Sequence, residues 1–120
     1  MKKMKTIKFT LLIILAGLFA VTLNSCKKSV DESPRARIIN NGTQKASVQI
    51  KTSNGNTVNI NNVDPGTSSA YSSYAAGQVT FTITVSSTNY VKILDIGIGY
   101  DYDIAIDTNN IITSISIRRN

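Results

Sequence analysis

Aspartates dominate the chemistry that this chain could carry. Several lie together near the C-terminal end, followed by two amides: Asp95, Asp101, Asp103, Asp107, Asn109 and Asn110. Calcium takes six to eight oxygen ligands of this kind. The chain has no Asp-x-Asp-x-Asp-Gly loop, so Asp101 and Asp103 could equally lie on the solvated face of a strand and Asp107 begin a turn. A calcium-stabilised module with Asp101, Asp103 and Asp107 as ligands is one alternative.

The same carboxylates raise the hypothesis of glycoside hydrolysis. A retaining site holds two carboxyl groups about 5–5.5 Å apart, whereas residues two apart on a strand are separated by about 6.5–7 Å. The chain contains no histidine, which is the usual general base. Both observations weigh against catalysis, so no catalytic residue is assigned. A small hydrolase that uses Asp101 and Asp103 is kept as the second alternative.

Tyrosines are the residues that could contact a partner, because each has an apolar ring and a polar tip. Tyr71 and Tyr74 follow a Pro-Gly turn, and Tyr100 follows Gly99. Tyrosines in strands also serve simply as packing. We predict ligand contact at Tyr71, Tyr74 and Tyr100, through loops around residues 64–74 and 97–100.

The N-terminal 25 residues have the order of a secretory signal peptide: a lysine-rich head, an apolar run from Phe9 to Leu23, and the small residue Ser25. The run is about 15 residues long, against about 20 for a membrane-spanning helix. Cys26 follows directly and is the only cysteine. This pattern resembles that of bacterial lipoproteins. The resemblance implies cleavage before Cys26, diacylglyceryl and N-acyl chains on it, and an outer-membrane destination, because Lys27 follows.

Removal of residues 1–25 would also change the charge of the protein. The whole chain has a formal net charge of +6, but four lysines and no acidic residue lie in the leader, which leaves nine basic and seven acidic residues, or +2. The remaining cations are scattered, whereas nucleic-acid binding needs them clustered on one face. With one cysteine and no histidine, neither a disulfide nor a zinc site is expected. We predict no nucleic acid and no cofactor.

After a polar tether at residues 26–34, apolar residues alternate with polar ones and no helical stripe is present. Residues 78–86 give the clearest alternation, and Asn54-Gly55 indicates a hairpin turn. The continuously apolar stretch 90–98 predicts a deeply buried strand. Turn signals recur every 8–12 residues. These features predict an all-β domain over residues 35–120, a small antiparallel immunoglobulin-like sandwich of seven or eight strands that follows an N-terminal signal helix. A closed barrel is the second choice.

Several motifs resemble those of bacterial cell-envelope β-sandwich domains of unknown function, which are common in lipoproteins. They are Arg37-Ile38-Ile39-Asn40, Gly66-Thr67-Ser68-Ser69, Tyr71-Ser72-Ser73-Tyr74-Ala75-Ala76-Gly77 and Gly99-Tyr100. The likeness covers about residues 35–107 and departs from the group where Asn40-Asn41-Gly42-Thr43 replaces a Pro-rich turn. The resemblance implies a sandwich on the envelope and supplies no catalytic residue.

The leading hypothesis is a lipid-anchored envelope domain, periplasmic or on the cell surface, that binds or scaffolds without catalysis. Its partners would be the membrane, through the lipid on Cys26, and a glycan or an envelope protein. The hydrolase and the calcium-stabilised module are the alternatives.

Overall fold

Eight strands make up the computed structural model, which describes residues 32–120. In chain order they are β1 (Arg35–Asn40), β2 (Ala46–Lys51), β3 (Thr57–Val63), β4 (Ser72–Ser73), β5 (Gly77–Val85), β6 (Thr88–Ile96), β7 (Tyr100–Ile106) and β8 (Ile112–Arg118). Within the described residues no helix is long and apolar enough to cross a membrane. The predicted leader and the lipidated Cys26 lie outside these residues.

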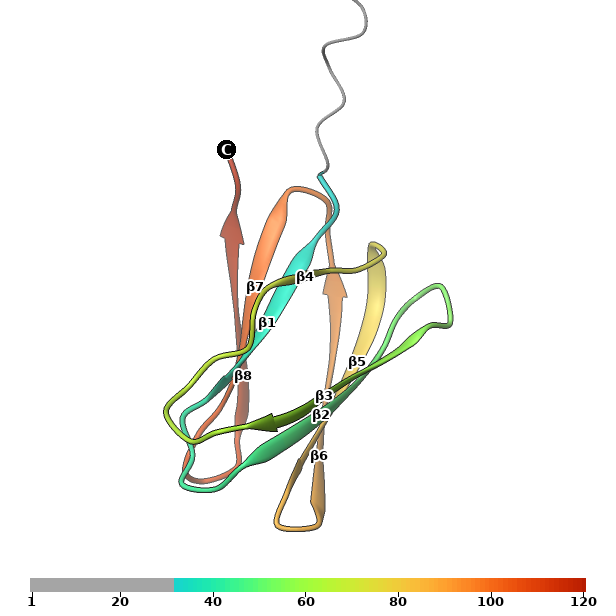
Figure 1. Ribbon diagram of the computed structural model, residues 1–120. Coiled ribbons are helices and arrows are strands. Elements are labelled where there is room, and N and C mark those ends of the chain that lie inside the picture. The colour runs from blue at the N-terminus through green and yellow to red at the C-terminus, as the bar shows by residue number, and fades with distance from the viewer. Residues whose placement is uncertain (1–31) are drawn as a thin grey trace, which may run out of the picture. The chain divides into compact units, whose positions relative to one another are not determined.

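The strands form two four-stranded sheets, in the orders β4-β1-β7-β8 and β3-β2-β5-β6 (Figure 1). This confirms the predicted all-β sandwich, and with two separate sheets the alternative of a closed barrel is wrong. One pair departs from the antiparallel prediction, because β1 and β7 run parallel. A parallel pair needs a long connection, and here the whole second sheet lies between the two strands in sequence.

Alternation with period two builds the core, as expected for strands that bury one face. Phe81 and Ile83 of β5 and Ile38 of β1 are fully buried. They pack with inward residues of both sheets, namely Ala36, Ala46, Val48, Ile50, Val63, Val79, Ile96, Tyr102, Ile104 and Ile106. The residues between them in sequence form the two outer faces.

The prediction of a deeply buried strand over residues 90–98 is wrong. Strand β6 lies at the edge of its sheet and pairs only with β5. Its inner face packs Leu94 against the core, while Val91 and Ile93 on the outer face are 58% and 56% exposed. A continuous apolar run is typical of a strand covered on both faces, but here the outer residues remain exposed to solvent.

The last residues of the predicted tether belong to the folded unit. Pro34 is buried, and the carbonyl of Glu32 accepts a hydrogen bond from the backbone N–H of Gly99. The carbonyl of Ser33 accepts one from Arg119. These bonds fix the start of the described chain beside the turn between β6 and β7. In Figure 1 this is the upper end of the sandwich, where the C-terminus also lies.

Candidate functional site

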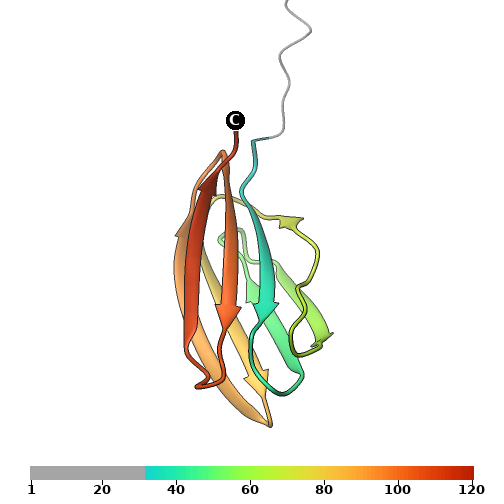
Figure 2. The same ribbon diagram turned by 90° about the vertical axis from the view of Figure 1, so that its left-hand side faces the viewer.

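The parallel pairing of β1 with β7 brings two arginines beside two aspartates. Arg35 is in register with Asp101, and Arg37 with Asp103. Each arginine donates twice to its partner, at 2.8 and 2.6 Å in the first pair and 2.8 and 3.1 Å in the second. We call these four residues the Arg–Asp ladder. Ala36, Ile38 and Ile104, which alternate with these residues, are buried in the core. The ladder therefore lies on the outer face of the sheet β4-β1-β7-β8, and this sheet is nearest the viewer in Figure 2.

Further side chains complete the ladder. Arg119 donates to Asp101 Oδ1 at 3.1 Å, and the Tyr71 hydroxyl donates to Asp103 Oδ1 at 2.5 Å. The Arg37 guanidinium lies 4.8 Å from the centre of the Tyr71 ring, close enough for a cation–π interaction. Tyr71 thus covers the ladder, held there by the segment that crosses from β3 to β4. The charges of the ladder are neutralised by one another.

These contacts determine the protonation of the aspartates. Hydrogen bonds from Arg35 lower the pKa of Asp101, and hydrogen bonds from Arg37 lower that of Asp103, more than partial burial raises either. The hydrogen bond to Asp103 raises the pKa of the Tyr71 phenol. A general acid needs a raised carboxyl pKa, so the arrangement of Asp101 and Asp103 favours structural ion pairs over catalysis.

The structure does not bring the predicted calcium ligands together. Asp107 follows the opposite end of β7 from Asp101, and its Oδ1 accepts hydrogen bonds from the backbone N–H groups of Asn109 and Ile111 in its own turn. Asp95 lies on β6, in the other sheet. Between residues 32 and 120 no group of three or more acidic, histidine or cysteine side chains could hold a metal ion.

The three predicted contact tyrosines have different environments. Tyr71 covers the ladder, and Tyr74 is buried in the core, where burial raises the pKa of its phenol. Only 7% of Tyr74 is exposed, and its hydroxyl has no hydrogen-bond partner among the described residues. Tyr100 is half-buried beside Tyr102, with 6.3 Å between ring centres. It lies at the end of the sandwich near Glu32, because the neighbouring Gly99 bonds to Glu32 and Arg119.

Sequence reasoning missed a polar pocket at the other end of the sandwich. Three turns meet there: residues 41–45 between β1 and β2, 86–87 between β5 and β6, and 107–111 between β7 and β8 (Figure 1). They enclose a cavity of about 220 Å³, the three-turn pocket, lined by Asn40, Gly42, Thr43, Gln44, Val85, Ser86, Thr88, Tyr90, Ile106, Asp107, Thr108 and Asn110.

Asn40 fixes one wall of this pocket. Its buried side chain donates to the carbonyls of Gln44 and Val63, at 2.7 and 2.9 Å, and accepts from the N–H of Gly42 at 2.9 Å. An asparagine can satisfy several backbone groups of a turn at once. The buried Asn40 side chain therefore holds the turn between β1 and β2 from the inside. The side chains of Thr43 and Gln44 on this turn make no hydrogen bond within residues 32–120.

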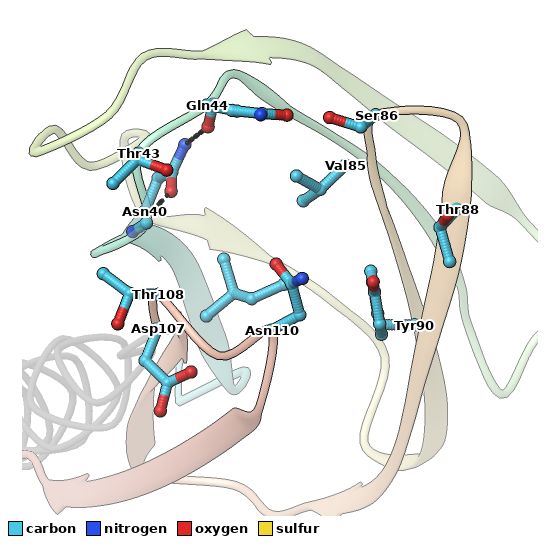
Figure 3. A pocket seen from close by; sticks show the side chains of 12 residues that line it. Asn40, Thr43, Gln44, Val85, Ser86, Thr88, Tyr90, Asp107, Thr108 and Asn110 are labelled. Carbon is cyan, nitrogen blue, oxygen red and sulfur yellow. Dashed lines mark hydrogen bonds between the residues drawn. The ribbon is translucent and has the colours of Figure 1, made fainter.

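Most other polar side chains of the pocket have no hydrogen-bond partner among the described residues 32–120. They are the side chains of Thr43, Gln44, Ser86, Thr88, Tyr90, Thr108 and Asn110. Figure 3 shows Gln44 reaching toward Ser86, and Asn110 rising between the turns toward Val85. Amides and hydroxyls that face a cavity without partners are available to a ligand.

Two other cavities have fewer polar side chains without a hydrogen-bond partner, although the buried Tyr74 hydroxyl of one of them has none. One of about 270 Å³ includes Thr52 and Asn54, but the Thr52 hydroxyl donates to the Asn54 side chain. Another of about 320 Å³ lies between β6 and β8 and includes Tyr102, whose hydroxyl already accepts a hydrogen bond from the N–H of Gly97. The three-turn pocket therefore offers the largest set of unengaged polar groups.

Backbone conformation also distinguishes the three-turn pocket. Ser86 and Ser87 have φ values of 49° and 64°, and Asn110 has 61°. Two positive-φ residues match the twist of a two-residue hairpin turn, but glycine and asparagine are the usual choices there. Left-handed serines are strained, and such strain clusters at ligand-binding positions. The sequence signalled turns at Asn40-Asn41-Gly42 and Asp107–Asn110, but Ser86-Ser87 carries no such signal.

No protein-family model matches this chain, and no curated protein matches its sequence. Among solved structures, it is similar to the NMR structure of a protein from Eubacterium rectale, with a TM-score of 0.52 and 18% identity over 74% of this chain and 91% of that one. The C-terminal domain of AlgF from P. aeruginosa has a TM-score of 0.49 and 15% identity, over 73% of this chain and 99% of that domain. The similarity to the Eubacterium rectale protein supports the fold alone.

Proposed function

We propose that this chain is a lipid-anchored, non-catalytic binding domain of the bacterial outer membrane, which holds a glycan or an envelope protein in the three-turn pocket. The lipid anchor rests on the lysine-rich leader, the apolar run and the single Cys26. The diacylglyceryl and N-acyl groups together carry three acyl chains and would give stable attachment, since one chain alone binds a membrane only marginally. The domain would then be located on the periplasmic or the cell-surface face of the outer membrane.

The position of the pocket supports this proposal. The described chain begins at Glu32, beside the turn between β6 and β7. Strand β1 leads away from this end and finishes at Asn40, a residue of the pocket. Six strand residues span about 20 Å. A domain tethered through its N-terminal end would therefore present the pocket at its far end, where a partner can approach.

The chemistry of the two regions supports binding over catalysis. Asp101 and Asp103 are ionised and held by arginines, so neither is suited to donate a proton. The pocket contains one carboxylate, Asp107, and that carboxylate supports its own turn. The observation that carries the proposal is the set of unengaged amides and hydroxyls that three separate turns direct into one cavity.

A crosslinked pull-down from intact cells tests the pocket as the binding site. The full chain would carry Gln44→Ala with Thr88→Ala, two exposed pocket residues without side-chain partners in the described structure. The matched control carries Gln78→Ala with Thr57→Ala, the same residue types exposed at the opposite end. We expect the pocket pair to lose the partner and the control pair to keep it. Equal recovery with both pairs would contradict the proposal.

Mass spectrometry of the mature N-terminus tests the anchor independently. We expect a peptide that begins at Cys26 and carries both diacylglyceryl and N-acyl groups. An unmodified thiol at Cys26, or an uncleaved leader, would refute the lipid anchor without bearing on the pocket.

A further inference from the structure

The lining of the three-turn pocket disfavours an anionic ligand. Among residues 32–120 no lysine or arginine lines it, and Asp107 is its only acidic residue. Lys45 follows Gln44 in sequence but is outside the lining, and its amine lies 3.9 Å from the Asp64 carboxylate. A phosphate or carboxylate ligand would meet no counter-charge here and would be repelled by Asp107. The lining therefore suits a ligand without net charge.

The unengaged groups both donate and accept hydrogen bonds. The amides of Gln44 and Asn110 each offer an NH₂ group and a carbonyl oxygen, and the hydroxyls of Ser86, Thr88 and Thr108 do both with one atom. A sugar ring presents several adjacent hydroxyls that also donate and accept. Because these side chains come from three turns, they can meet such hydroxyls from different directions.

Apolar surface in the pocket complements the carbon side of a sugar ring. Val85 and Ile106 line it, and Tyr90 stands at its edge, where the ring is partly exposed (Figure 3). An aromatic ring beside convergent polar groups is the usual composition of a small-molecule site. The hydrogen bonds of Asn40 and Asp107 hold two of the turns in place before a ligand binds, which reduces the ordering cost of binding.

We infer that the three-turn pocket binds a neutral sugar residue of a glycan, through the amides of Gln44 and Asn110, the hydroxyls of the turns and the Tyr90 ring. This inference rests on the proposed function, because it names the ligand class of the same site. Uncharged oligosaccharides bind in this pocket, and acidic or phosphorylated ones bind less well.

A glycan-binding measurement on the full chain, purified from the envelope in detergent, tests the ligand class. The probes are panels of neutral, uronic-acid-containing and phosphorylated oligosaccharides of matched length. We expect the neutral panel to bind, and Gln44→Ala and Tyr90→Ala each to weaken that binding about tenfold, as the loss of one good contact does. Tyr90→Phe, which keeps the ring, should lose less, and this variant preserves the test if Tyr90→Ala fails to fold. The control variants Gln78→Ala and Thr57→Ala should bind the neutral oligosaccharides as tightly as the unmodified protein does.

The outcomes separate this inference from the proposed function. Preferential binding of acidic or phosphorylated glycans would overturn the neutral ligand class. If no glycan binds but the cellular pull-down still depends on Gln44 and Thr88, the sugar inference is wrong and the pocket remains the binding site. If neither measurement depends on these residues, both conclusions fall.

Discussion

The Arg–Asp ladder and the three-turn pocket lie in the same domain and use their polar groups in opposite ways. In the ladder, two arginines and two aspartates are paired with one another at hydrogen-bond distance. In the pocket, most polar side chains are uncharged and have no partner among residues 32–120. The difference shows that charged residues can mark a stabilising element, while unengaged neutral groups mark the place where a ligand can add bonds.

Strand pairing explains the difference between these two regions. The parallel register of β1 and β7 sets Arg35 and Arg37 directly beside Asp101 and Asp103, so the charges on the sheet satisfy one another. The turns have no neighbouring strand to supply partners. Their backbone groups are satisfied locally, for example by Asn40 and Asp107, and their remaining side chains stay open.

Removal of the Asn40 side chain, which holds one wall of the pocket, should have the largest effect on stability. Asn40→Ala removes the side-chain hydrogen bonds to the carbonyls of Gln44 and Val63 and from the N–H of Gly42, and Asn40 is only 1% exposed. Buried groups left unpaired cost about 1–3 kcal/mol each, so we expect a total loss near 3 kcal/mol. Urea denaturation measures it. Asn59→Ala on exposed β3 is the control, and an equal loss in both would contradict the role of Asn40.

Disruption of the ladder should have the next largest effect. Asp101→Asn removes the charge that Arg35 and Arg119 share, and we expect a loss of about 2 kcal/mol in the free energy of unfolding. The matched variant Asp95→Asn changes an exposed aspartate and should cost less than about 0.5 kcal/mol. Glycan binding should be retained in both. A ladder variant that is folded but does not bind glycan would contradict the assignment of binding to the pocket alone.

Acid should weaken the ladder, because its two aspartates must be ionised to pair with the arginines. The folded state lowers the pKa of Asp101 and Asp103, so their stabilisation is complete above the unfolded pKa of about 3.9 and is lost as the pH falls through the lower folded values. We expect thermal stability to fall below about pH 4. The fall should be shallower in the double variant Asp101→Asn, Asp103→Asn. Identical acid slopes in the two proteins would show that the ladder does not contribute.

Relief of strain in the β5–β6 turn should have the smallest effect, and it should be stabilising. Replacing Ser86-Ser87 with Asn-Gly supplies residues that accept positive φ at both positions. We expect a gain of about 1 kcal/mol in thermal or urea unfolding. Glycan binding should weaken modestly, because the Ser86 hydroxyl is lost from the pocket. A loss of stability would mean that the left-handed serines are not strained.

The architecture was accessible from the sequence because alternation with period two is a local signal. The clearest alternation, over residues 78–86, coincides with β5 (Gly77–Val85), in which Val79, Phe81 and Ile83 are buried. Two features were not accessible. The apolar run over residues 90–98 does not show that β6 lies at the edge of its sheet, which is why β6 was expected to be buried. Nor can the alternation reveal that β1 pairs with β7 rather than with a neighbour in sequence.

The candidate site was less predictable than the fold. Asp101 and Asp103 were singled out as chemically active, and Arg35 and Arg37 were not connected to them, because those residues meet only through the β1–β7 register. Two of the three turns of the pocket were predicted as turns, yet their meeting depends on the topology. The role of Ser86-Ser87 had no signal, since serines give little indication of a left-handed turn.

Site-specific photocrosslinking in intact cells tests the central claim most directly. A photoreactive phenylalanine analogue would replace Thr108 at the rim of the pocket in one full-length variant, and Tyr71 over the ladder in another. Both positions lie on the described surface, but on different regions of it. We predict a crosslinked glycan-bearing or protein partner from position 108 and none from position 71. Crosslinking from position 71 alone, or equally from both, would contradict the assignment of binding to the three-turn pocket.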